Sequence, residues 1–439
     1  MLSLADNETV TQVGPRTPMG DYLRSFWMPF LLTEELPAPD CPPVRVELLN
    51  EQLVAFRDTS GRVGLVQHRC PHRRAGLFYG RNEENGLRCV YHGWKFDVEG
   101  NCVDMPAEPE WSNFRNKVRI TAYPCRETGG VIWTYMGPPD RTPSIPDLGW
   151  LSVPPDHRYI TKRIERANWV QGMEGGLDPA HSNYLHSTMD RHWQTPQWRE
   201  TMKNSPRLRD RYHAFDKSPR FFVHETDYGL LIGAQRNAEP DTFYWRVTHW
   251  AAPFYNLIGQ QPATSAGPVT RAGSLAWIPL NDTTTFVFKV DWRDDRPLSE
   301  DDVRAAENFS GPTLPGSFLP AGNAENDYLI DRGLQQTTTF TGIGATQWQD
   351  LAVQETMGPI VDRTEEHLGI SDTAIIRMRQ LLLRGARDLR EGAEPYGASH
   401  PDVYNIRAAE AVLPRSDGFD PHLLRSFSEV GAGNGATGA

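Results

Sequence analysis

The stretch that decides the fold is Cys70-Pro71-His72, followed after sixteen residues by Cys89-Val90-Tyr91-His92. Each half offers one thiolate and one imidazole. The second half continues as Gly93-Trp94-Lys95-Phe96, and Pro, Gly and aromatic residues of this kind are typical of loops at strand ends. The pattern C-x-H-x16-C-x2-H therefore predicts two metal-binding loops on a β domain.

Three interpretations of these four residues compete. Two thiolates and two imidazoles are the ligands of a Rieske [2Fe–2S] cluster, whose raised potential suits one-electron transfer. A Cys2His2 zinc site is the second, but zinc fingers usually have C-x2-4-C and H-x3-5-H spacing. Ordinary loop residues are the third, and the paired loop context disfavours them. We therefore expect Cys70, His72, Cys89 and His92 to hold a [2Fe–2S] cluster.

Composition narrows the class of protein. The 439 residues suffice for two or three domains, and no apolar run of about eighteen residues predicts a membrane span. The start of the chain lacks the basic and apolar segments of a secretory signal. Five cysteines, of which two are assigned to iron, favour a reducing cytoplasm. A net charge of −11 argues against nucleic acid as a partner, although a basic pocket can still bind an anionic substrate.

A second metal motif lies at Asp178-Pro179-Ala180-His181-Ser182-Asn183-Tyr184-Leu185-His186. Two imidazoles and one carboxylate form a facial triad, which leaves open positions on Fe(II). Zinc hydrolases usually carry H-E-x-x-H, which is absent here, and surface or capping histidines are the other alternative. Because an electron-carrying cluster implies a redox acceptor in the same chain, we expect iron at His181 and His186.

The carboxylate of this second site cannot be chosen by spacing. Asp178 followed by Pro179 is also a good helix-capping pair, and both roles are compatible. The candidates downstream are Asp282, Asp327, Asp331, Asp350, Glu355 and Asp362.

Patterning divides the chain into two domains. Short strands and turns from 44 to about 137 predict a small β-sandwich, with a hairpin closed at Asn50-Glu51. A Pro-rich stretch from 137 to 155 marks the boundary with a domain of antiparallel sheet and helices, including a helix over 371–390. We expect an N-terminal segment at 1–43 that packs with the catalytic domain, a cluster domain at 44–150, a catalytic domain at 151–425 and a flexible tail at 426–439.

The two motifs in this order resemble the oxygenase component of Rieske non-haem iron aromatic-ring hydroxylases. The segments that resemble the phthalate 4,5-dioxygenase branch are 40–46, 77–84, 171–178, 349–350 and 355–360. The resemblance implies an α+β fold, with a Rieske β-sandwich domain followed by a catalytic domain of helix-grip type, an antiparallel sheet flanked by helices. Glu174 departs from the naphthalene-type enzymes, which tend to have Asn at this position.

Residue roles follow from this resemblance by position. The residues Cys70, His72, Cys89 and His92 match the cluster ligands, and His181, His186 and Asp350 match the ligands of the mononuclear iron. Asp178 matches a catalytic aspartate that connects His181 to the second cluster histidine, here His92, of a neighbouring subunit. The resemblance therefore implies a homotrimer or a hexamer of stacked trimers.

The activity implied by the resemblance is that of a dioxygenase in the catabolism of aromatic compounds. NADH would supply electrons through a separate reductase, and an aromatic carboxylate such as phthalate would be cis-dihydroxylated with O2. A monooxygenase or O-demethylase of an aromatic acid is the alternative, and an electron-transfer protein is the alternative outside the enzymes. Arginine binds carboxylates in bidentate fashion, so Arg207 and Arg246 are the expected substrate contacts, with Arg236 as a competitor.

Overall fold

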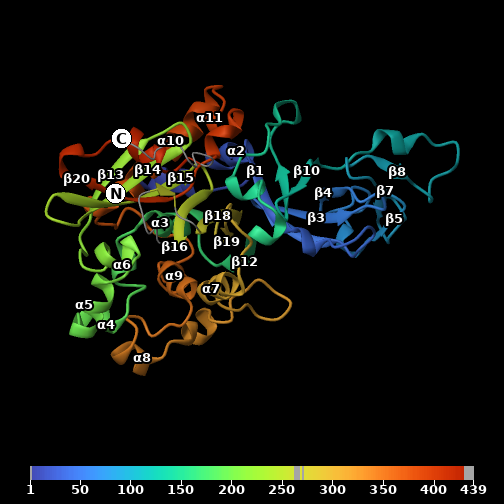
Figure 1. The fold of residues 1–439 in the computed structure, drawn as a ribbon. Coiled ribbons are helices and arrows are strands. Elements are labelled where there is room, and N and C mark those ends of the chain that lie inside the picture. Colours follow the sequence, from blue (N-terminus) through green and yellow to red (C-terminus); the bar gives the residue numbers. More distant parts are fainter. Residues whose placement is uncertain (1, 262–266, 269–270, 430–439) are drawn as a thin grey trace. The chain divides into compact units, whose positions relative to one another are not determined.

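The structure is a computed structural model that describes residues 2–261, 267–268 and 271–429 (Figure 1). The chain forms two compact units. The large unit comprises residues 1–11, 146–277 and 283–439, and the small unit comprises residues 12–145 and 278–282. None of the helices in the described ranges is both long enough and apolar enough to cross a membrane.

The two units divide between residues 145 and 146, which lie within the Pro-rich stretch at 137–155. It assigns residues 12–43 to the small unit, because the strand over Trp27–Leu32 pairs there with Val131–Tyr135. This differs from the expected packing of the whole segment 1–43 with the catalytic domain, of which residues 1–11 alone belong to the large unit. The expected domain boundaries stay predictions, and most of the expected tail, residues 430–439, lies outside the described residues.

Three antiparallel sheets build the small unit. One has the strand order β1-β11-β10, and two have four strands in the orders β2-β3-β4-β9 and β5-β6-β7-β8 (Figure 1). Residues of both four-stranded sheets share one apolar core, which also contains Cys70 and Cys89. The bounds are α2 (Pro18–Arg24), β1 (Trp27–Leu32), β2 (Val44–Leu48), β3 (Glu51–Arg57), β4 (Val63–Gln67), β5 (Arg81–Glu83), β6 (Gly86–Arg88), β7 (Lys95–Phe96), β8 (Cys102–Asp104), β9 (Ala122–Tyr123), β10 (Cys125–Thr128) and β11 (Val131–Tyr135).

The hairpin between β2 and β3 forms as predicted, but its turn lies one residue earlier. Leu48 pairs with Glu51, so the turn residues are Leu49 and Asn50, with φ of 49° and 63°. Two successive positive φ angles are typical of the type I′ turn, which matches the twist of the strands. The N–H of Leu49 donates to the carbonyl of Pro279 at 3.1 Å, and this contact stabilises the shifted turn.

One large antiparallel sheet organises the large unit. Its main path runs β12-β19-β18-β16-β15-β14-β13, and β20 pairs with both β15 and β17. The strands are β12 (Arg158–Glu165), β13 (Arg220–Glu225), β14 (Gly229–Asn237), β15 (Thr242–Ala251), β16 (Tyr255–Gln261), β17 (Gly267–Pro268), β18 (Arg271–Asn281), β19 (Thr284–Trp292) and β20 (Ala409–Pro414). The antiparallel sheet that the patterning predicted for this part of the chain is therefore confirmed.

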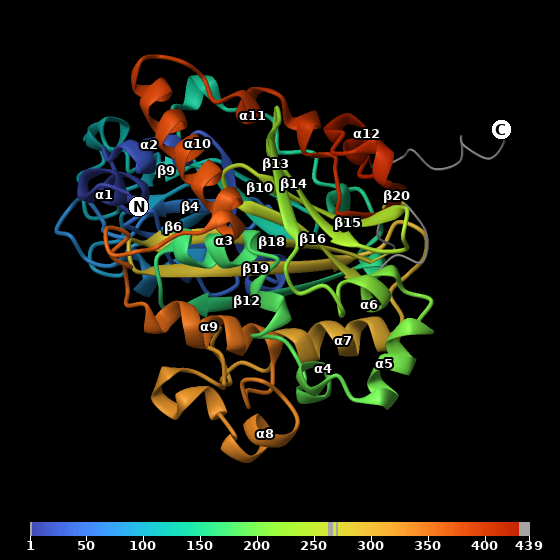
Figure 2. The ribbon, with the colours of Figure 1, turned by 90° about the vertical axis from the view of Figure 1, so that its left-hand side faces the viewer.

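Helices cover the large sheet. Figure 2 shows α3 lying across the strands, with α7 and α9 beside β12. The helix predicted over 371–390 is α10, and Ser299 caps α7, accepting from the N–H of Asp302 at 3.2 Å. The helices are α1 (Leu4–Thr11), α3 (Trp169–Leu177), α4 (Met189–Trp193), α5 (Pro196–Lys203), α6 (Leu208–Tyr212), α7 (Glu300–Ser310), α8 (Arg332–Thr337), α9 (Thr346–Thr356), α10 (Thr373–Arg390), α11 (Tyr396–Ser399) and α12 (Pro421–Ser426). The expected α+β class is confirmed.

Candidate metal centres and the adjoining cavity

The two cysteine–histidine loops share one backbone design. In the first loop the N–H of Cys70 donates to the carbonyl of Ala75 at 2.8 Å, and the N–H of Arg74 donates to the carbonyl of Cys70 at 2.9 Å. The loop that begins at Cys89 repeats both bonds at the equivalent positions, at 2.8 and 3.0 Å. Arg74 and Gly93 occupy equivalent places with positive φ, 64° and 77°. The repeated turn presents one thiol and one imidazole from each loop.

The two candidate thiol ligands of these loops form one pair, and the two candidate imidazole ligands form another. Cys70 and Cys89 are both 2% exposed, and the rings of His72 and His92 lie 4.4 Å apart between centroids. The indole of Trp94 stacks on His72 at 4.5 Å and 9° and covers one face of this imidazole, while His72 itself stays exposed. Burial, together with the neighbouring Cys89, raises the pKa of the Cys70 thiol to about 11. A thiol of this kind is ionised by a bound metal, so the donor set fits a cluster.

The small-unit site is wider than a single-metal site. Among the described residues, one group alone brings three His, Cys, Asp or Glu donor atoms within 4.8 Å of one another, and it lies in the large unit. The four donors from the two loops are therefore spread over more space than one ion spans. Two thiolates on one iron and two imidazoles on another require such a spread.

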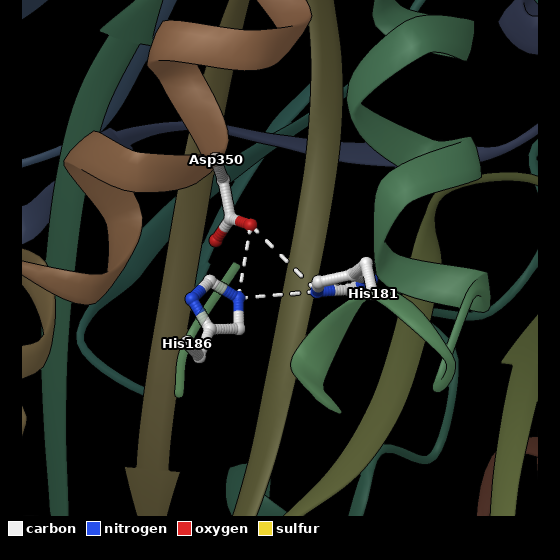
Figure 3. Close-up of side chains that lie close together, drawn as sticks. All are labelled: His181, His186 and Asp350. Carbon is white, nitrogen blue, oxygen red and sulfur yellow. Dashed lines mark hydrogen bonds and ion pairs between the residues drawn. The ribbon is translucent and has the colours of Figure 1, made fainter. Parts of the chain in front are cut away.

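The compact group in the large unit consists of His181, His186 and Asp350 (Figure 3). The two Nε2 atoms lie 3.1 Å apart, and Asp350 Oδ1 lies 3.1 Å from His186 Nε2 and 3.8 Å from His181 Nε2. Donors at right angles on metal bonds of about 2.1 Å lie about 3.0 Å apart. Two imidazole lone pairs and a carboxylate that face one another would repel without a cation between them. The geometry therefore fits a two-histidine, one-carboxylate iron site.

Each histidine of this group is oriented through its other ring nitrogen. Gln349 Oε1 lies 2.7 Å from His186 Nδ1, and Gln349 Nε2 donates to the carbonyl of Ile343 at 2.8 Å. The amide orientation is thereby set, so Gln349 accepts from Nδ1–H and Nε2 stays free for metal. Asp178 Oδ2 lies 3.5 Å from His181 Nδ1 and accepts from the His181 N–H at 3.2 Å. Both imidazoles therefore present Nε2 to the same point.

Asp178 caps a turn and also contacts His181, and its functional role stays a prediction. It follows the end of α3, and its Oδ1 accepts from the N–H of Ala180 at 2.7 Å, so it caps the turn that leads to His181. Burial disfavours its carboxylate, but the hydrogen bonds to His181 outweigh burial and lower the pKa of Asp178. A charged acceptor therefore faces His181 Nδ1.

The other acidic candidates for the iron site have different partners. Asp282 accepts from the N–H of Val13 within the small unit, and Asp331 caps α8. Glu355 accepts from the Tyr328 hydroxyl at 2.7 Å, and Asp362 accepts from Thr364 in an exposed turn. Asp327 is absent from the compact donor group. The structure thus brings Asp350 alone of the six to the histidines.

The loop that carries the two histidines is held by residues that sequence reasoning missed. Ser182 contacts buried His213 through Oγ and Nε2 at 3.3 Å, and Ser187 contacts His192 at 2.8 Å. Arg191 donates to the carbonyl of His213 at 2.9 Å. These partners follow the metal loop in sequence, but no spacing rule identifies them. They join the residues next to both metal histidines to the surrounding structure.

A cavity adjoins the His181–His186–Asp350 group. Strand alternation directs Arg246 and Thr248 of β15, and Leu275 and Trp277 of β18, toward it. The residues that α9 contributes recur at helical spacing, Gln347, Asp350 and Gln354. The further lining residues include Arg163, Gly175, Gly176, Asp178, Arg209, Ile258 and Phe309. One face of the sheet and one face of α9 therefore form its walls.

Glycines of α3 allow these walls to approach closely. A Cβ on Gly176 would lie 2.2 Å from Asn256 Nδ2 and 2.6 Å from Trp277 Cη2. A Cβ on Gly172 would lie 2.3 Å from Trp277 Nε1. The indole of Trp277 therefore packs directly against α3. A side chain larger than glycine at either position would clash with it.

The cavity contains arginines whose side chains form no ion pair among the described residues, although the carboxylate of Glu410 acts to raise the pKa of Arg246. Arg246 is 8% exposed and forms no hydrogen bond or ion pair with its side chain among the described residues, and the same is true of the half-buried Arg209. Burial and the nearby Arg209 lower the pKa of Arg246 to about 10, so it stays charged at neutral pH. The structure leaves Arg207 exposed at the start of α6 and outside the cavity lining. Arg236 is buried, does not line the cavity, and donates to the carbonyl of Asp216 at 3.0 Å.

Two protein families match the chain. The Rieske [2Fe-2S] domain matches residues 26–124, which lie in the small unit. The family described as LigXa C-terminal domain like matches residues 134–429, which carry the His181–His186–Asp350 group. The expected cluster domain and the expected second domain thus both have counterparts in known families.

Curated relatives extend over nearly the whole chain. The 3-chlorobenzoate-3,4-dioxygenase oxygenase subunit of Comamonas testosteroni is 37% identical and covers 94% of this chain and 95% of its own. The phthalate 4,5-dioxygenase oxygenase subunit of Pseudomonas putida is 38% identical, over 92% and 90%. The 5,5'-dehydrodivanillate O-demethylase oxygenase subunit of a Sphingobium species is 32% identical, over 90% and 83%. Dioxygenases and an O-demethylase therefore stand at similar identity.

A solved structure supports the fold. Dicamba monooxygenase bound to dicamba has a TM-score of 0.59 to this chain at 18% identity, over 84% of this chain and 99% of that one. At this identity the likeness concerns the fold, and it agrees with the α+β architecture of sheets and helices described above.

Proposed function

The chain belongs to the Rieske non-haem iron aromatic-ring-hydroxylating oxygenases, and on this premise we propose that it is a dioxygenase component that cis-dihydroxylates an aromatic carboxylate. Membership makes the protein an enzyme, so an electron-transfer protein without substrate is no longer an alternative. The observation that carries the proposal is the cavity in which unpaired Arg246 and Arg209 share walls with His181, His186 and Asp350.

The residues of the two metal centres have separate tasks in this proposal. Cys70, His72, Cys89 and His92 would hold the [2Fe–2S] cluster, which carries one electron at a time when bound. His181, His186 and Asp350 would hold Fe(II), which offers open positions for dioxygen beside the substrate when bound. Gln349 and Asp178 keep both Nδ1 atoms protonated, and the cavity walls orient the aromatic ring.

The arginines provide the reason for an acidic substrate. A guanidinium that is buried without a counter-ion is costly, and a bound carboxylate would supply the missing charge and acceptors. Arg246 projects from β15 into the cavity and Arg209 joins it from α6. We therefore propose Arg246 and Arg209 as the carboxylate contacts, and Arg207 stays a separate prediction. Whether the acid is phthalate is part of the proposal, supported by the relative that acts on phthalate.

Two partners follow. The relatives are oxygenase subunits, which implies a separate reductase, and NADH is its proposed electron source. A homotrimer or hexamer is proposed as well, with Asp178 linking His181 to His92 of the partner subunit. The side chain of Asp178 is 23% exposed, which leaves room for a second contact. Cys41, Cys102 and Cys125 are unpaired, which supports the proposed reducing, cytoplasmic location.

One alternative product class stays open, because the Sphingobium relative is named an O-demethylase. Two inserted oxygen atoms give a cis-dihydrodiol, whereas one gives a hydroxylated or demethylated acid. The same metal ligands serve both outcomes, since the pose of the substrate decides which atom is attacked.

Oxygen uptake by the purified, iron-loaded protein tests the proposal. The assay contains NADH, a phthalate-class reductase and a panel of benzoates, phthalates, phenoxybenzoates and methoxybenzoates. We expect Arg246→Met to raise the KM for the best acid about 10- to 100-fold, since a hydrogen bond to a charged group contributes about 1.5–3 kcal/mol. The KM for the matching neutral amide should change far less.

Two further variants separate the contacts. Arg209→Met tests the second proposed arginine, and Arg207→Met tests the prediction made from sequence. Arg390→Met, at the exposed end of α10, is the matched control. Equal effects of Arg246→Met on acid and amide would remove the carboxylate role, and no uptake with any aromatic acid would overturn the proposed substrate class.

A further inference from the structure

A buried amide without partners lies on the α9 wall of the cavity. Gln347 is 1% exposed, and neither its Nε2 nor its Oε1 has a hydrogen-bond partner among the described residues. It lies one turn before Asp350 on the same face of α9 and lines the same cavity. Leaving a buried donor or acceptor unpaired costs free energy. The amide therefore calls for a partner that enters the cavity.

Arg163 on β12 is a second unpartnered group in this cavity. Its residue is 6% exposed, its Nε has no acceptor, and its side chain forms no ion pair among the described residues. Burial lowers the pKa of Arg163 to about 10, so it remains a cation at neutral pH. Its neighbour on the same strand face, Glu165, is fully buried, and burial raises the pKa of that carboxyl to about 8. Glu165 is then largely uncharged at pH 7, and the carboxylates of Asp350 and Glu355 act to raise the pKa of Arg163 without forming an ion pair with it.

This second polar group is separate from the proposed carboxylate contacts. In the sheet order β12-β19-β18-β16-β15, Arg163 and Arg246 lie on strands four spacings apart, roughly 19 Å between strand axes. The wall between them carries Trp277, Leu275 and Ile258, which are apolar. A ring that lies against these side chains would meet Arg246 on one side and the Gln347–Arg163 wall on another.

We infer that Gln347 and Arg163 form a second recognition site, which selects substrates that carry an oxygen-bearing substituent in addition to the carboxylate at Arg246. The inference rests on the proposed function, because it requires an aromatic acid in the cavity. The amide both donates and accepts, and the guanidinium donates, so a hydroxyl or a second carboxylate satisfies them. Hydrogen or a halogen at that position leaves both groups unpaired, and sites of this kind reject such analogues strongly.

Binding measured by anaerobic titration calorimetry tests the inference. The protein is the iron-loaded holoenzyme with oxidised cluster and without reductase, so that no turnover occurs. The ligands are benzoate, phthalate, 3- and 4-hydroxybenzoate, isophthalate and terephthalate. We expect at least one substituted acid to bind ten or more times as tightly as benzoate. Gln347→Leu should lower this ratio of affinities at least tenfold.

Two variants identify the substituent. Gln347→Glu keeps an acceptor but adds negative charge, so it should weaken the dicarboxylates much more than the hydroxybenzoates. Arg163→Met should also weaken the dicarboxylates more, if the second group is a carboxylate. Equal loss for hydroxy and dicarboxylic acids in Arg163→Met would assign the site to a neutral hydroxyl. Either pattern supports the site.

Controls make the result decisive. Gln336→Leu changes an exposed glutamine in the same way. Its ratio of affinities for the substituted acid and benzoate should equal that of the unaltered protein. If Gln347→Leu lowers the cluster absorbance or the unfolding temperature, the shorter Gln347→Asn replaces it. Unchanged ratios in the Gln347 and Arg163 variants would overturn the inference while leaving the proposed function intact, and would assign the amide to water alone. Failure of every acid, benzoate included, to bind would overturn both.

Discussion

At the scale of single residues, the candidate iron site depends on side chains that bind no metal themselves. Gln349 and Asp178 each take one Nδ1–H and leave one Nε2 free. The amide of Gln349 is fixed in turn by the carbonyl of Ile343. Such partners set both the tautomer and the orientation of an imidazole, so they control affinity for the metal.

Replacement of Gln349 by leucine tests this dependence. Without an acceptor at Nδ1 the His186 ring loses its preferred tautomer and orientation, so Gln349→Leu should weaken mononuclear iron binding about 10- to 100-fold. The measurement is iron affinity by competition with a chelator, alongside the visible spectrum of the cluster, which should not change. Gln336→Leu serves as the control. An unaltered iron affinity in Gln349→Leu would show that the contact between Gln349 and His186 does not contribute to iron binding.

The variant Asp178→Asn separates the capping role of Asp178 from the role of its negative charge. The single oxygen of an asparagine can still accept from the Ala180 N–H, as Asp178 Oδ1 does, so the loop and its iron should be retained. Loss of the carboxylate beside His181 should lower turnover about 10- to 100-fold. Iron content and steady-state oxygen uptake measure the two effects. Normal turnover in this variant would contradict a functional role for the carboxylate charge and would leave Asp178 with a capping role alone.

At the scale of elements, α3 connects the cavity to a buried ionic network. Glu174 accepts from Arg363 Nε at 3.0 Å and from Arg379 Nε at 2.7 Å, and Arg363 donates to Asn7 of α1 at 2.9 Å. Gly175 and Gly176 follow directly and line the cavity. Glu174 therefore holds α3 in place through its contacts with Arg363 and Arg379.

Glu174→Gln should destabilise the large unit by about 3–5 kcal/mol, because it leaves two buried guanidinium groups short of charge. Burial raises the pKa of Glu174, but Arg363 and Arg379 outweigh burial and lower it below the ordinary 4.5. The stabilisation is therefore complete above pH 4.5 and is lost as the pH falls through the lower folded-state pKa. Chemical unfolding at pH 7 and in mild acid measures both, with the exposed Glu365→Gln as control. A difference between variant and parent that is independent of pH would contradict the ionic account.

Short-range residue spacing in the sequence predicted the helices and strands better than it predicted how they come together in the fold. The two metal motifs, the strands within β15, β18 and β19, and helix α10 follow from short-range spacing. The order of strands in the sheet does not, and neither does the arrival of Asp350 and Gln349 from α9 at a loop near residue 181. Gln347 and Arg209 carry no local signal, since their roles depend on which walls the sheet and helices bring together. The exposed Arg207 shows the limit directly, because two residues further along α6 decide which arginine lines the cavity.

At the scale of the whole molecule, the chain combines a cluster unit with a cavity unit, and each has its own donor set. The small unit offers two thiols and two imidazoles, and the large unit offers two imidazoles and a carboxylate. The chain should therefore bind three irons, two in the cluster and one in the large unit.

Iron content measures this directly. The unaltered protein should contain three irons per chain, and His181→Ala should contain two with an undiminished cluster spectrum. Two irons in the fully loaded parent would contradict the assignment of the large-unit site.

The fate of labelled dioxygen distinguishes dioxygenation from monooxygenation. With 18O2, NADH, a phthalate-class reductase and the best aromatic acid, we expect a product that carries two labelled oxygen atoms and two additional hydrogens. A product with one labelled atom, or labelled formaldehyde from a methoxy acid, would contradict dioxygenation and assign the chain to the monooxygenases and O-demethylases of its family.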